Sequence, residues 1–121
     1  MKTMTWRVLI ALLLCLALPA SRAAAEMGAG FFDGNDLFEW CTTRDALCTG
    51  YVAGISDELT DLEAIGAVTV TVCEPKEVKV KQMAEVVTRY LEKHPETRDR
   101  QASELVYRAL VEAWPCKRGG R

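Results

Sequence analysis

The sequence predicts a small all-α protein: a bundle of about four helices with one short extended segment, stapled by two disulfides. Apolar residues recur at helical spacing in four stretches of the chain, whereas only one short stretch alternates as a β-strand does. Four cysteines follow a leader-like N-terminus, an even number that suits disulfides in an exported domain. No second strand-like run is present to pair with the first, which disfavours a sheet-based fold.

Residues 1–25 have the layout of a secretory signal peptide. Two basic residues precede an apolar run over residues 8–18, and the alanines at positions 23–25 offer a cleavage site of the A-x-A kind. The apolar run is shorter than the roughly 20 residues that cross a bilayer. We therefore expect an exported protein, cleaved near Ala25, with 96 of the 121 residues in the mature chain.

The mature chain is acidic. It keeps all 17 acidic residues but only 12 basic ones, which gives a formal charge of −5. This balance argues against nucleic acid or an anionic membrane surface as the target, and it suits a basic protein partner. No later apolar run is long enough to span a membrane.

Four cysteines remain after the leader: Cys41, Cys48, Cys73 and Cys116. Two disulfides allow three pairings, and the sequence does not decide among them. We favour Cys48–Cys73 with Cys41–Cys116, because these bridges would tie the second helix to the following loop and join the two ends of the domain. The cysteine spacing matches no zinc site.

Residues 26–34 are small and glycine-rich, and we expect a flexible N-terminal segment ahead of a helical domain over residues 35–116. Asn35 or Asp36 is the expected cap of the first short helix. A T-x-x-D signature over residues 42–45 then indicates that the chain turns and starts a second helix.

The second helix, expected over about residues 44–59, is the one around which we expect the bundle to be arranged. Gly50 and Gly54 lie four residues apart in it. Because glycine costs about 1 kcal/mol relative to alanine inside a helix, two of them need a packing reason. We interpret Gly50 and Gly54 as helix-packing residues that let another backbone come close.

Residues 67–72 are rich in β-branched residues, and valine alternates strictly with threonine or alanine, as is typical of a strand. This stretch is either an extended connector packed on the helices or an edge that pairs with the same segment of a second copy. Helical spacing returns over residues 80–94 and ends before Pro95.

Thr97 is the expected cap of the last helix, over residues 98–114. Tyr107 and Val111 lie off the apolar stripe of this helix, and we expect them to face a partner subunit. Residues 117–121 form a basic tail that we expect to be disordered.

We find no catalytic or cofactor-binding motif in the sequence. The only histidine, His94, lies at the expected end of a helix, where a capping role suits it better than catalysis. We therefore predict a protein that is not an enzyme and that needs no metal or cofactor.

Five short motifs follow one another along the chain: GNDLFEWC at residues 34–41, CTGYVAGISD at 48–57, CEP at 73–75, YLEKHPE at 90–96 and ALVEAWPC at 109–116. Taken in order, they resemble the Rap/Tai family of immunity proteins, the exported antidotes to the peptidoglycan amidases of type VI secretion. The resemblance implies a periplasmic, mostly helical, often homodimeric protein that binds a toxin amidase and blocks its active cleft. One departure is the loss of a threonine cap before the helix expected over residues 80–94, where this chain has Glu77-Val78-Lys79.

An inhibitor of this kind needs a rigid scaffold and a protruding polar element. From charge and loop character, we expect the connector over residues 57–72 to be that element, with partner contacts from Asp57, Glu58, Asp61 and Glu63. Two alternatives stay open. One is a small periplasmic stress protein or chaperone, and the other is a structural homodimer without a toxin partner.

Overall fold

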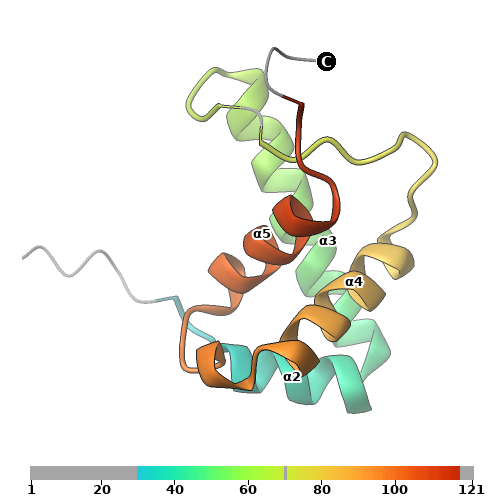
Figure 1. Cartoon of the computed structure of the whole chain (residues 1–121), viewed down its shortest axis with the longest axis vertical. Coiled ribbons are helices and arrows are strands. Elements are labelled where there is room, and N and C mark those ends of the chain that lie inside the picture. The colour runs from blue at the N-terminus through green and yellow to red at the C-terminus, as the bar shows by residue number, and fades with distance from the viewer. Residues whose placement is uncertain (1–29, 70, 118–121) are drawn as a thin grey trace, which may run out of the picture.

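The computed structural model describes residues 30–69 and 71–117, so the expected signal peptide of residues 1–25 and most of the expected tail lie outside this part of the chain. The described residues form four α-helices and one short 3₁₀ helix, and no strand longer than an isolated bridge. In chain order these are α2 (Gly34–Thr43), α3 (Asp45–Ala64), α4 (Val80–Lys93), η1 (Pro95–Thr97) and α5 (Ala102–Ala113), as Figure 1 shows. The all-α class with two disulfides is confirmed.

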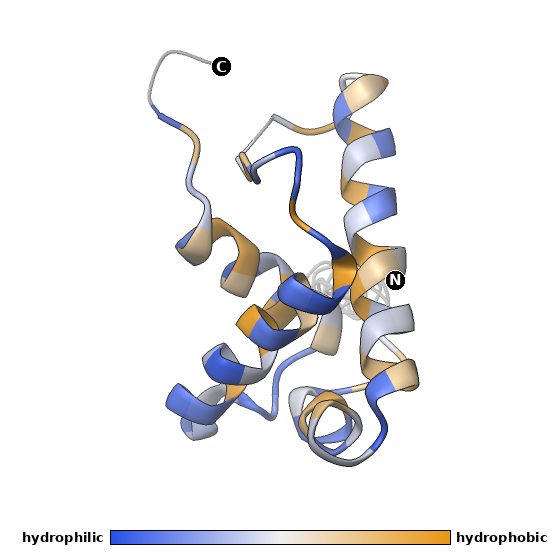
Figure 2. Ribbon diagram, turned by 90° about the vertical axis from the view of Figure 1, so that its right-hand side faces the viewer, coloured by the Kyte–Doolittle hydropathy of each residue, from blue (hydrophilic) through white to orange (hydrophobic). Residues whose placement is uncertain are grey.

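The four α-helices pack around one core in which each contacts the other three. In Figure 2 the hydrophobic faces of the helices are turned toward one another. Five of the eleven buried hydrophobic residues lie on α5: Ala102, Leu105, Val106, Ala109 and Leu110. The bundle is therefore arranged around α5, and our expectation that the second helix has this place is wrong, because α3 buries only two residues in the core.

α2 begins at Gly34, and its cap is Asp33, not Asn35 or Asp36 as we expected. The Asp33 carboxylate accepts hydrogen bonds from the N–H groups of Asn35 and Asp36. Gly34 itself is buried and helical, so it belongs to the domain and not to the N-terminal segment. A side chain there would collide with Leu105 and come within 2.9 Å of the backbone near η1, so only glycine lets α2 lie this close to its neighbours.

The disulfides join Cys41 to Cys48 and Cys73 to Cys116. The pairing that we favoured, Cys48–Cys73 with Cys41–Cys116, is therefore wrong. Cys41 pairs with Cys48 because the turn between α2 and α3 is tight, with only Arg44 between the two helices. This turn brings the Cα atoms of Cys41 and Cys48 to 4.7 Å from each other, within the range that a disulfide requires.

Gly50 and Gly54 lie on an open face of α3 and are exposed. A methyl group added at either position would meet no atom of another part of the described chain within 4 Å. Our interpretation of these two glycines as helix-packing residues is therefore wrong. The glycine that a close approach requires is Gly34.

α4 begins at Val80 and ends before Pro95, as the sequence predicts. In place of the missing threonine cap, the Gln82 side chain accepts a hydrogen bond of 2.9 Å from the Lys79 N–H. The last helix is shorter than predicted, because η1 is a separate turn and α5 starts only at Ala102. Thr97 does not cap α5; its hydroxyl donates to the backbone carbonyl of His94.

Candidate functional site

The end of α3 and the turn after it project beyond the neighbouring helices (Figure 1). We call residues 57–68 the acidic arm. Figures 1 and 2 show this part of α3 extending past the end of α5 and past α4. The predicted connector over residues 57–72 is wrong in its first half, because α3 continues to Ala64 and the loop begins only at Ile65.

A glycine turn forms the tip of the acidic arm. Gly66 has φ +73°, its N–H donates to the Glu63 carbonyl, and the Ala67 N–H donates to the Leu62 carbonyl at 2.9 Å. These two bonds make a Schellman motif, in which a left-handed glycine satisfies the last carbonyl groups of a helix. The turn leaves Ile65 76% exposed. The tip is therefore apolar and held by backbone hydrogen bonds.

The four acids that we predicted as partner contacts do not form one patch. Asp57, Glu58 and Asp61 are exposed, whereas Glu63 is half-buried. Glu63 lines a cavity of about 20 Å³ where α3 meets the following loop, α4 and α5. The solvent-facing acids of the arm are therefore Asp57, Glu58 and Asp61, with Glu63 turned toward the loop.

Charge is distributed unevenly along the chain. Residues 45–75 contain six acidic residues and no lysine or arginine, whereas residues 76–117 contain nine basic and seven acidic residues. α3 also has no basic residue in its last turn, where the helix dipole favours a cation by roughly 0.3–1 kcal/mol. The acidic arm therefore carries negative charge that nothing on α3 compensates, and a basic surface would relieve it.

An open strip runs along α3 into the acidic arm. Gly50, Gly54, Asp57 and Asp61 recur at spacings of three and four residues, so they share one face of the helix. All four are exposed. A partner that approaches this face meets bare helix backbone beside two carboxylates.

The loop that returns from the acidic arm is fixed to the segment after α5. Val72 forms an isolated antiparallel bridge with Pro115, and the Cys73 N–H donates to the Trp114 carbonyl at 2.8 Å. The disulfide from Cys73 to Cys116 closes the same contact. Residues 71 and 72 of the stretch predicted as strand-like are thus fixed to the segment after α5, whereas residues 67–69 are exposed. Pairing of this stretch with a second copy stays a prediction.

A side-chain hydrogen bond adds to this anchor. The hydroxyl oxygens of Thr71 and Tyr107 lie 2.8 Å apart. Tyr107, which we left for a partner subunit, is therefore engaged within its own chain. Val111 is half-buried.

The described residues contain no group of three or more His, Cys, Asp or Glu side chains that is placed to hold a metal ion. His94 is the C-cap of α4 and lies 3.2 Å from Glu96. The pKa of the Glu96 carboxyl is lowered, most by a hydrogen bond with the backbone of Glu96 itself and next by the hydrogen bond with His94. Burial raises the pKa of Tyr51, which a hydrogen bond with Ser103 partly offsets.

Comparison with known proteins identifies the family. A family model for Rap1a immunity proteins matches residues 33–116. The chain belongs to this family. The match to the Rap1a immunity proteins begins at Asp33, the cap of α2, and ends at Cys116 of the second disulfide, so it covers the whole bundle. It confirms the resemblance to the Rap/Tai immunity family.

No curated protein and no solved structure matches this Rap1a-family chain significantly. Within its described residues, none of the helices has the length and apolar content needed to cross a membrane.

The apolar tip of the acidic arm was not predicted in this Rap1a-family chain, because the second helix was expected to end near Leu59, which places Ile65 inside a connector. The signal was available, because helix-forming residues continue to Ala64 and Gly66 follows where a helix C-terminus favours glycine.

Proposed function

We propose that this Rap1a-family protein binds a type VI secretion effector, a peptidoglycan amidase, in the periplasm and blocks its active cleft with the acidic arm. Membership of the immunity family supports a toxin protein as the partner. The observation that carries the choice of surface is the acidic arm itself. It presents Asp57, Glu58 and Asp61 to solvent on a protruding helix, in a segment without a basic residue.

In this proposal inhibition is steric, and the two chemical parts of the arm have different roles. The exposed Ile65 at the tip enters the cleft, where burial of an aliphatic side chain contributes roughly 1.5–3 kcal/mol. The carboxylates meet a basic rim and raise the rate of association, an effect that salt screens. The open faces of Gly50 and Gly54 let the partner approach the backbone of α3 closely.

Rigidity supports the same role for the arm. A segment that is already held in its bound conformation loses less conformational entropy on binding. The Schellman bonds at Gly66 hold the tip, and the disulfide from Cys73 to Cys116 anchors the returning loop. Two disulfides also favour an oxidising compartment, which supports export to the periplasm.

We further propose that the protein forms a homodimer. The surface that we assign to it is an apolar patch beside α2 and α3, where Phe31 is 98% exposed, Phe32 43% and Leu47 44%. Light scattering of the purified protein tests this assignment. Replacing Phe31 and Leu47 by serine is expected to give monomers, and an unchanged dimer would place the contact elsewhere.

The experiment that tests the proposed function uses a peptidoglycan amidase effector of a type VI secretion system, sought first in the reading frame next to that of this protein. Export of that amidase to the periplasm of a host cell is expected to stop growth, and co-export of the immunity protein is expected to restore it. The Asp57→Lys/Asp61→Lys variant is expected to protect poorly. Growth arrest that the unaltered protein fails to relieve would argue against the proposal.

A chaperone is the alternative of another class. It requires broad apolar faces that are free to hold unfolded clients, whereas the described helices bury eleven hydrophobic residues in the core and leave only scattered large apolar side chains exposed. A purified sample that captures many unrelated proteins, and no amidase, would favour the chaperone instead.

A further inference from the structure

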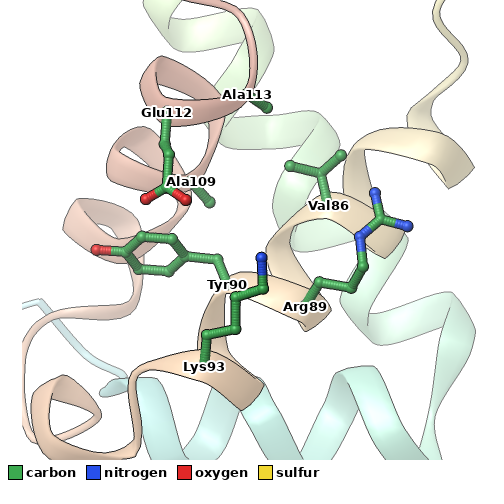
Figure 3. A pocket seen from close by; sticks show the side chains of 7 residues that line it. All are labelled: Val86, Arg89, Tyr90, Lys93, Ala109, Glu112 and Ala113. Atoms are coloured by element: carbon green, nitrogen blue, oxygen red, sulfur yellow. The ribbon is translucent and has the colours of Figure 1, made fainter.

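A groove of about 190 Å³ runs between α4 and α5, and none of its residues belongs to the acidic arm. Figure 3 shows its seven lining side chains: Val86, Arg89, Tyr90, Lys93, Ala109, Glu112 and Ala113. The groove forms because α5 carries alanine at two positions one helical turn apart, which leaves space against the larger side chains of α4. This space is apolar at its floor and charged along its edges.

The two edges carry opposite charges. Arg89 and Lys93 lie one turn apart on α4, and Glu112 lies on α5, so cations line one edge and a carboxylate the other (Figure 3). None of the ion pairs in the described part of the chain involves these three residues; those pairs are His94–Glu96, Arg100–Glu104 and Arg108–Glu104. Each edge therefore has charge available for a ligand.

The charge pattern selects the class of ligand. A simple anion would gain from Arg89 and Lys93 but would lie close to the Glu112 carboxylate, which repels it. A purely apolar helix would cover all three charges without pairing them, which costs free energy. A small molecule with a carboxylate and an ammonium group satisfies both edges.

We propose that this groove binds a short zwitterionic peptide. Its carboxylate pairs with Arg89 and Lys93, of which the planar guanidinium offers two parallel donors. Its amino group pairs with Glu112, and a small side chain such as that of alanine lies over Ala109 and Ala113. This inference does not rest on the acidic arm or on an effector.

Such peptides have two sources, the cell wall and the ends of degraded protein chains. Both offer the same carboxylate and amino groups. They differ because cell-wall peptides contain a D-configured acidic residue and a diamino acid, whereas protein fragments contain L-residues alone.

Nuclear magnetic resonance of the disulfide-bonded protein tests the proposal. Titration with the dipeptide alanyl-glutamate is expected to shift amide signals near Ala109 and Ala113 with saturation, at a dissociation constant of roughly 1 mM. Arg89→Gln and Lys93→Gln are each expected to weaken binding about fivefold or more. Lys81→Gln, which removes the same charge from the same helix outside this groove, is the matched control and is expected to bind normally.

The second edge has its own test. Acetylation of the peptide amino group is expected to weaken binding to the unaltered protein but to have no further effect on the Glu112→Gln variant, because the partner of that amino group is then gone. A cell-wall tripeptide that binds more tightly than alanyl-glutamate would assign the source to the cell wall, and the reverse order would assign it to protein fragments. Shifts that do not saturate, or that survive both Arg89→Gln and Lys93→Gln, would overturn the proposal.

Discussion

The hydroxyl oxygen of Tyr107 on α5 lies 2.8 Å from that of Thr71, 36 residues earlier in the chain. This hydrogen bond joins the most buried helix of the bundle to the loop that returns from the acidic arm. One residue beyond Thr71, Val72 pairs with Pro115, and the second disulfide follows at once. The path of the loop is therefore set by side chains and a covalent bond, without a β-sheet.

Replacement of Tyr107 by phenylalanine removes this hydrogen bond and leaves the ring in place. The free energy of unfolding is expected to fall by about 0.5–1.5 kcal/mol, the usual range for one such bond. Amide exchange is expected to become faster at residues 71–73, because the loop is less firmly held. Chemical denaturation and hydrogen exchange measure these two effects.

The control for this variant is Tyr90→Phe. The hydroxyl of Tyr90 makes no hydrogen bond within the described residues, and the side chain is half-buried like that of Tyr107. Its loss is expected to change the stability by less than about 0.5 kcal/mol. Equal effects of the two substitutions would mean that the bond from Tyr107 to Thr71 contributes little.

The two disulfides are expected to differ in their contribution to stability. Cys73 and Cys116 are 43 residues apart in sequence, and Cys41 and Cys48 only 7. In the loop-entropy model, closing these loops stabilises the fold by about 4 and about 2 kcal/mol respectively. Paired serine variants of each bridge, compared by denaturation, are expected to show this order, and the reverse order would contradict the entropic account.

Two glycine substitutions are expected to have opposite effects. Gly34→Ala places a methyl group against Leu105 and a neighbouring backbone, so it is expected to destabilise the protein by roughly 1–3 kcal/mol. Gly50→Ala adds a methyl group in open space on a helix and is expected to stabilise it by about 0.5–1 kcal/mol. Thermal unfolding of both variants measures the difference. A destabilising Gly50→Ala would show that this face of α3 is covered in solution.

Much of this fold follows from periodicity and punctuation in the sequence. Pro95 marks the end of α4, and the spacing of Leu105, Val106 and Ala109 marks the buried face of α5. These signals are local, because a helix repeats every 3.6 residues and a proline stops it.

What the sequence did not predict depends on contacts between distant residues. The pairing of Cys41 with Cys48 follows from a turn around Arg44 whose tightness no composition reveals. Gly34 and Gly50 are both helical glycines. Only the position of Leu105 shows that a side chain would collide at Gly34 and not at Gly50. The charge of residues 57–63 indicated the candidate site from the sequence. Its apolar tip could be predicted only if α3 was known to extend to Ala64.

Glu104 is expected to make the stability depend on pH in the acidic range. It lies between Arg108 at 2.7 Å and Arg100 at 3.0 Å, and hydrogen bonds from these two lower its pKa. A group whose pKa is lower in the folded state contributes stability above its unfolded pKa, near 4.5, and this contribution is lost as the pH falls through the folded pKa. Because the three side chains are substantially exposed, Glu104→Gln is expected to cost only about 0.5–1 kcal/mol at neutral pH.

The difference in the free energy of unfolding between the unaltered protein and Glu104→Gln is therefore expected to shrink below about pH 4. Glu112→Gln, on the same helix but outside any ion pair of the described residues, serves as the control and is expected to show a smaller effect. If this difference in the free energy of unfolding stays constant from pH 3 to pH 7, the ion pairs of Glu104 do not cause it.

The measurement that tests the central claim most directly is the affinity of the purified protein for its effector amidase, determined by calorimetry for two matched variants. Asp57→Lys/Asp61→Lys reverses two charges on the acidic arm, and Glu85→Lys/Glu92→Lys reverses two exposed charges on α4. We expect the first variant to bind roughly ten- to a hundredfold more weakly, most of all at low salt, and the second to bind like the unaltered protein. Equal affinity of both variants would contradict the assignment of the acidic arm as the inhibitory surface.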